Sequence, residues 1–141
     1  MSTFTAHLTR PSTRRRPALA GAAGLALVAV IHLLDGPGSL EESSAIGLLE
    51  LALAAASVPL ALALVVCPVR DAWLAAGALC AVALGFYVAS RTVGLFGMSD
   101  DIGNWAALPG MLNVLSEALV VGLAAAAIAR SSKRLGVRRS A

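Results

Sequence analysis

Charged residues are scarce in this sequence. They make up 13% of its 141 residues, while hydrophobic residues make up 58%. Soluble domains contain about 25% charged and roughly 45–50% apolar residues. The mean hydropathy is +0.82. One domain of this length could not hide so much apolar surface from water, which excludes an ordinary soluble protein and makes lipid the expected solvent.

The residues that carry most cofactor and enzyme chemistry are also few. Of two histidines, only His32 lies in an apolar run, so a haem held by two histidines of one chain is excluded. The cysteines, Cys67 and Cys80, form no CxxC or zinc-type spacing, and their depths differ too much for a disulfide. Neither GxSxG nor HExxH occurs. We therefore predict no metal and no cofactor, and an enzyme is less favoured than a protein without catalytic activity.

Aromatic residues are rare, at 4%, although the chain is basic, with a net charge of +3. The basic residues gather in two tails, four of them in residues 1–17 and five in residues 130–141. No aromatic platform accompanies them, so nucleic-acid binding is not expected. Anionic lipid headgroups are the expected partners of the tails.

Four long apolar runs fill the rest of the chain. A membrane-spanning helix needs roughly 17–25 residues. Strands are disfavoured, because the runs are long and rich in Ala and Leu and because lipid leaves an open sheet edge unsatisfied. Asp35-Gly36-Pro37-Gly38 is expected to end the first run, and Pro109 suits the first turn of the last. The sequence predicts an all-α integral membrane four-helix bundle, a domain over residues 18–129. Its helices are expected at residues 18–34, 46–67, 72–90 and 108–129.

The two basic tails predict the orientation of this bundle. Basic segments stay on the cytoplasmic side, so both termini are expected in the cytoplasm, which agrees with four crossings. The loops at residues 35–45 and 91–107 then face outside. The localisation that follows is the cell membrane, with a multi-pass topology.

A signal peptide is an alternative for the N-terminus, because three arginines at 14–16 precede the first apolar run. The apolar core of a cleaved signal has about 7–15 residues and is followed by an A-x-A site. This run is longer, and no such site follows it. A retained helix is therefore favoured.

Small residues are expected to form the helix contacts, because they let helices approach closely in lipid. They are most simply the seams of one bundle, although a homo-oligomer would use the same residues. The small residues in question are Ala18, Gly21, Ala22, Gly24, Gly77, Ala81, Gly85, Gly122 and Ala126.

Polar residues within the runs are the main functional lead, because ionisable groups inside a membrane usually face a partner or a cavity. By the predicted topology they all lie in the outer half of the membrane. Positions 87 and 91 share one helix face, as do positions 113 and 117. The candidate ligand-binding residues are His32, Glu50, Tyr87, Arg91, Asn113 and Glu117.

Within this polar cluster, Arg91 is the only cation available to two carboxylates. A guanidinium can hold a carboxylate in a two-pronged geometry, so Arg91 is predicted to pair with Glu117 or Glu50. Pairing that only fixes helix register stays open as an alternative. A divalent metal at His32, Glu50 and Glu117 lacks a tight ligand motif. The remaining loop carboxylates are expected to be solvated, namely Glu41, Glu42, Asp100 and Asp101.

Three short segments carry a resemblance: IHL at 31–33, SRTVGLFG at 90–97 and LSEAL around Glu117. In these the chain resembles a group of small four-helix membrane proteins common in actinobacteria, with a helix-1 IHL, an SRTxGLPG pattern and a glutamate in the last helix. Phe96 departs from that pattern, which has proline there. The resemblance covers roughly residues 18–129. It implies the same topology and the same residues, and it implies no reaction.

Two functions remain in view. The polar cluster is expected to bind, or help to move, a small solute or ion from the outer side. The alternative is a structural or assembly subunit of a larger membrane complex, whose loops would contact a membrane protein partner.

Overall fold

The computed structural model describes residues 15–95 and 99–139, which form four α-helices. The helices are α1 (Arg15–Glu42), α2 (Ser44–Val66), α3 (Arg70–Thr92) and α4 (Leu108–Arg139). Each of the four is long and apolar enough to cross a membrane. The prediction of an all-α protein with four apolar helices is therefore confirmed at this level.

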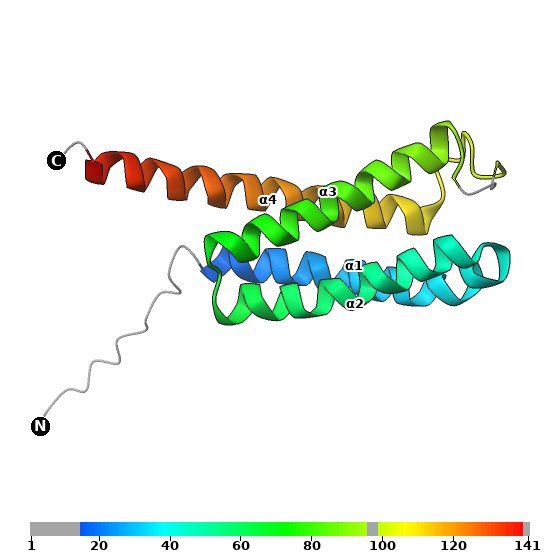
Figure 1. Cartoon of the computed structure of the whole chain (residues 1–141), viewed down its shortest axis with the longest axis horizontal. Helices are drawn as coiled ribbons and strands as arrows, with labels where there is room; N and C mark the ends of the chain where they lie inside the picture. The colour runs from blue at the N-terminus through cyan, green and yellow to red at the C-terminus, as the bar shows by residue number, and fades with distance from the viewer. Residues whose placement is uncertain (1–14, 96–98, 140–141) are drawn as a thin grey trace, which may run out of the picture.

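The helices run alternately up and down and form a closed ring of neighbours (Figure 1). α1 packs against α2 and α4, and α3 packs against α4 and α2. One end of the bundle, here called the loop end, carries the α1–α2 turn and the loop at 93–107. The other, the termini end, carries the start of α1, the end of α4 and the α2–α3 connection (Figure 1).

The predicted end of the first helix at residue 34 is wrong, because α1 continues through Pro37 to Glu42. Membrane helices tolerate proline where neighbouring groups compensate for the lost hydrogen bond. Here α2 supports the helix: a Cβ at Gly36 would lie 2.9 Å from Leu51 Cδ2. The predicted loop at 35–45 therefore shrinks to Ser43, whose N–H donates to the Ser39 carbonyl over 2.7 Å.

The α1–α2 hairpin depends on a close backbone approach at Gly47. A Cβ there would lie 2.5 Å from the Leu40 nitrogen and 2.7 Å from its Cα. Backbone atoms cannot move aside as a flexible side chain can. Glycine is thus required for α1 to meet α2 directly after the turn.

The other helix ends differ less from the prediction. α4 extends from the predicted end at 129 to Arg139, so most of the predicted C-terminal tail is helical. Basic residues near a helix C-terminus interact favourably with its dipole, which suits this extension. The predicted N-terminal tail lies mainly outside the described residues, and Arg15 to Pro17 belong to α1.

The apolar core lies in the termini half of the bundle. Gly21 admits Trp73, whose Cη2 would lie 2.8 Å from a Cβ at that position, and Gly24 admits Val120 in the same way. The core contains no disulfide: Cys80 is buried, Cys67 is exposed, and both are free. The core is built from Ala18, Ala22, Leu25, Leu64, Trp73, Ala76, Cys80, Val120 and Ala124.

The predicted small-residue seams are confirmed only in part. Gly21 and Gly24 of α1 are buried at helix contacts, and a Cβ at Gly77 would lie 2.8 Å from Ala124 Cβ. The prediction is wrong for four residues, because their helices meet their neighbours along other faces. The exposed four are Ala81, Gly85, Gly122 and Ala126.

Candidate functional site

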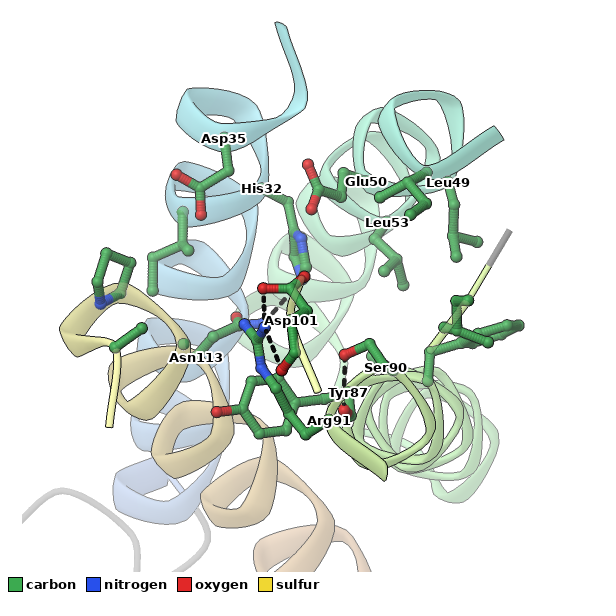
Figure 2. Close-up of a pocket in the computed structure, with 18 residues that line it drawn as sticks. His32, Asp35, Leu49, Glu50, Leu53, Tyr87, Ser90, Arg91, Asp101 and Asn113 are labelled. Carbon is green, nitrogen blue, oxygen red and sulfur yellow. Dashed lines mark hydrogen bonds and ion pairs between the residues drawn. The ribbon is translucent and has the colours of Figure 1, made fainter. Parts of the chain in front are cut away.

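A cavity of about 250 Å³ opens between the four helices in the loop half of the bundle. Every helix and the loop at 93–107 contribute to its wall. Figure 2 shows polar side chains from all of these segments pointing toward a common centre. The polar residues of the wall are His32, Asp35, Glu50, Tyr87, Ser90, Arg91, Asp101 and Asn113.

Five of the six candidate residues from the sequence therefore line one cavity, and the sixth, Glu117, lies directly beneath it. The heptad-like spacing of α4 explains this placement, because residues three or four apart share a helix face. The buried face of α4 carries Asn113, Ser116 and Glu117 toward the loop end, and Val120 and Ala124 toward the termini end. The buried face of α4 thus changes from polar to apolar toward the termini end, and the base of the cavity lies where this change occurs.

Three side chains, here called the His–Asn–Glu cluster, meet at that base: His32 and Asn113 line the cavity, and Glu117 lies beneath them. The Asn113 Nδ2 group donates to Glu117 Oε1 over 3.1 Å and lies 3.0 Å from His32 Nε2. His32 Nε2 is 3.5 Å from Glu117 Oε1. Their exposed fractions are 8%, 7% and 0%, so helices α1 and α4 are joined by a polar contact that is shielded from the surroundings.

Several buried polar atoms around the cavity have no hydrogen-bond partner among the described residues. Three of them are acceptors, Glu50 Oε2, Asn113 Oδ1 and Glu117 Oε2, and one is a donor, Arg91 Nε. Leaving such a group unsatisfied costs about 1–3 kcal/mol. Glu50 and Asn113 line the cavity, and their two free acceptors favour a guest that brings hydrogen-bond donors or positive charge.

Arg91 stands at the rim of the cavity, where it forms an ion pair with Asp101. The predicted pairing of Arg91 with Glu117 or Glu50 is therefore wrong. Arg91 is in the last turn of α3, and the following loop returns to it: the Gly103 N–H donates to the Arg91 carbonyl over 2.9 Å. Asp101, expected to be solvated, thereby becomes the partner of Arg91, while Glu117 is held by the cluster below.

Aromatic contacts extend this rim. The Arg91 guanidinium lies 5.1 Å from the centre of the Tyr87 ring, a cation–π distance. Tyr87 in turn meets Trp105 edge to face, with ring centres 6.2 Å apart. Gly110 admits the Tyr87 ring, since a Cβ there would lie 3.0 Å from Tyr87 Cε2. The loop is thus tied to α3 and α4 above the cavity.

Two carboxylates of the wall were not among the candidates from the sequence. Asp35 follows His32 by three residues and so shares its helix face, a signal that holds only if the helix continues past residue 34. Asp101 gives no short-range signal, because its contact depends on how the loop returns. Glu41, Glu42 and Asp100 are exposed, as predicted.

The charges of the wall favour a cation. Asp35, Glu50 and Asp101 face the cavity, against one permanent cation, Arg91, which is already paired. Among the described residues, no group of three or more His, Cys, Asp or Glu side chains is placed to hold a metal ion. The alternative of a metal at His32, Glu50 and Glu117 therefore lacks a converged set of donors, and the wall suits a small cation with an apolar part better.

Comparisons with known proteins assign no family to the chain. No family model matches the chain, and no curated protein or solved structure does so either. The resemblance to the small actinobacterial four-helix proteins stays a prediction.

Proposed function

We propose that this is a multi-pass protein of the cell membrane that binds, or helps to move, a small cationic solute or ion through the cavity at its loop end. The observation that carries the proposal is the cavity itself: four apolar helices enclose about 250 Å³ lined by carboxylates. Ionisable groups at such a depth usually serve a pathway or a ligand. Part of the wall is apolar, including Ile31, Leu49 and Phe86, which suits an organic cation.

The proposed orientation places both termini in the cytoplasm and the cavity toward the outside. Arg15, Arg16, Arg70 and Arg130 lie at or near the termini end, and basic residues favour the cytoplasmic side. The loop end carries mostly acidic residues. The solute would therefore enter from the outer face.

The cavity is a binding site rather than an open channel. Leu25, Leu64 and Val120 have an exposed fraction of 0% in the termini half of the bundle. They close the space between the helices below the His–Asn–Glu cluster. Movement of a solute across the membrane would require these residues to repack or a partner protein to take over the solute.

Thermal unfolding of the purified full chain tests the proposal, with ammonium, tetramethylammonium and a short primary alkylamine as probes. A ligand that binds only the folded state stabilises it by about 2.7 kcal/mol at a hundred times its Kd. We expect a saturable rise of Tm with at least one probe. Glu50→Gln should abolish the rise, and Glu42→Gln, on the exposed end of α1, should retain it.

Two results would contradict the proposal. One is a Tm that none of the three cations raises beyond the effect of matched ionic strength. The other is a rise that Glu50→Gln leaves intact. Recovery of a stoichiometric companion protein in mild detergent, combined with either result, would favour the alternative role as an assembly subunit.

A further inference from the structure

Glu117 occupies an unusual place for a carboxyl group. It has an exposed fraction of 0% and lies nine residues after the start of α4 at Leu108, a rise of about 14 Å. The hydrocarbon core of a bilayer is roughly 30 Å thick. Glu117 therefore lies well inside the apolar span Leu108–Ser132, where a lone carboxylate is very unfavourable.

The groups that face Glu117 offer it no permanent positive charge. α1 contributes His32, α3 contributes the Cys80 thiol, and α4 itself contributes Asn113. α2 places Glu50 on the cavity side, near His32. No lysine or arginine of the described residues forms an ion pair with Glu117.

A neutral His32 beside an ionised Glu117 carries one negative charge, so the pair becomes electrically neutral when it binds one proton. With that proton, His32 and Glu117 are either an imidazolium beside a carboxylate or a neutral imidazole beside a carboxylic acid. Without it, one uncompensated negative charge remains in the bundle. We propose that His32 and Glu117 together bind one transferable proton, which reaches Glu117 from the cavity by way of His32.

Two side chains of the described residues both line the cavity and contact Glu117, namely His32 and Asn113, and of these the imidazole is the group that can take up and release a proton. His32 lines the cavity and Glu117 does not, so the imidazole separates the two. The His32 side chain lines the cavity and keeps an exposed fraction of 11%. Its ring nitrogen Nε2 is the one that faces Glu117 at 3.5 Å.

The transfer is balanced in atoms and charge. A solvent proton adds to Nδ1 of a neutral His32 that carries its hydrogen on Nε2. The Nε2–H bond then breaks as that hydrogen binds Glu117 Oε1, which leaves a neutral imidazole with its hydrogen on Nδ1. Only in this product can Nε2 accept from Asn113 Nδ2, so the 3.0 Å separation of those atoms corresponds to the product. Before the transfer, Nε2–H faces Glu117 Oε1 and Asn113 Nδ2 donates to that oxygen alone. Asn113 acts as a positioning residue, because the same Nδ2 group also donates to Glu117 Oε1.

The proposed proton route does not continue from Glu117 toward the termini end of the bundle. Cys80 and Val120, at 0% exposure, and Ala124, at 2%, belong to the apolar core below Glu117. The proton therefore enters and leaves on the cavity side. This inference adds a proton to the cation site of the proposed function, and its test uses no solute, so the two can fail separately.

Infrared spectroscopy after a pH jump, on the full chain in lipid nanodiscs, measures this proton directly. We expect a pH-dependent carbonyl stretch of a protonated carboxylic acid that Glu117→Gln removes. His32→Gln should slow its appearance by about a hundredfold, the usual contribution of a positioned proton-transfer group, and Glu42→Gln should leave the rate unchanged. A wild-type rate in His32→Gln, or no titrating band of Glu117, would overturn the inference.

A second measurement keeps the inference testable if His32→Gln does not fold. In the wild-type protein, nitrogen-15 NMR of His32 and the infrared band of Glu117 are followed over the same pH range. A shared proton requires both signals to change with common midpoints, since the protons of strongly interacting groups belong to the pair. Independent midpoints, or a His32 signal that never responds when Glu117 does, would overturn the inference as well.

Discussion

The two halves of this bundle are made by the same four helices and differ in what those helices bury. Toward the termini end, α1 and α4 bury Leu25, Val120 and Ala124; toward the loop end, they bury His32, Asn113 and Glu117. The first half is closely packed, and the second encloses a cavity. In the loop half, α1 and α4 do not continue their apolar contact, and they place ionisable side chains at the cavity instead.

The difference between the halves indicates a division of labour. In lipid, helices associate through close packing, which the termini half supplies with glycines at its contacts and a buried tryptophan. Buried polar pairs are weak contributors to stability, and well-packed apolar residues often replace them without loss. The proposed function gives the polar groups of the loop half a role in binding, while the packing of the termini half holds the helices together.

The largest expected effect concerns packing in the termini half. Leu64→Ala removes a side chain with 0% exposure, whereas Leu62→Ala removes one with 60% exposure on the same helix. Buried leucine-to-alanine changes cost about 2–5 kcal/mol, and the exposed change should cost far less because lipid fills the space. Reversible unfolding in detergent or bicelles measures both, and equal losses would contradict the assignment of stability to this half.

The smallest expected effect concerns the two ends of the molecule. Ser99→Cys places a thiol on the exposed loop, and the native Cys67 is exposed at the termini end. The substitution should change stability by no more than about 0.5 kcal/mol. An impermeant thiol reagent added to intact cells should label position 99, and should label Cys67 only after the membrane is opened. The reverse pattern would turn the cavity toward the cytoplasm.

Local patterns predict the helices but not all of their contacts. The apolar runs and the charge of the tails are properties of contiguous residues, and the spacing of Asn113 and Glu117 is a property of one helix. The path of α1 through Pro37 depends on Gly36 meeting Leu51 of α2 and on Gly47 of α2 meeting Leu40 of α1, contacts between two helices that helix propensity does not predict. The ion pair of Arg91 and Asp101 depends in the same way on the return of a loop.

The candidate site shows the same limit. The sequence indicates His32, Glu50, Tyr87, Arg91, Asn113 and Glu117 because polar residues stand out in apolar runs. The sequence does not indicate which of these side chains contact one another. α1 and α3 both pack against α4, but Glu117 contacts His32 of α1, whereas Arg91, in the last turn of α3, pairs with Asp101 of the following loop.

The central claim is that the His–Asn–Glu cluster serves ligand and proton binding and not the stability of the fold. The triple variant His32→Leu, Asn113→Leu, Glu117→Met tests it most directly, by reversible unfolding with and without the alkylamine probe. We expect a free energy of unfolding equal to that of the wild type or higher by about 1–4 kcal/mol, as for other buried polar clusters replaced by apolar residues. The rise of Tm with the amine and the infrared band of Glu117 should both be lost. A variant that is markedly less stable, or one that still responds to the amine as the wild type does, would contradict the claim.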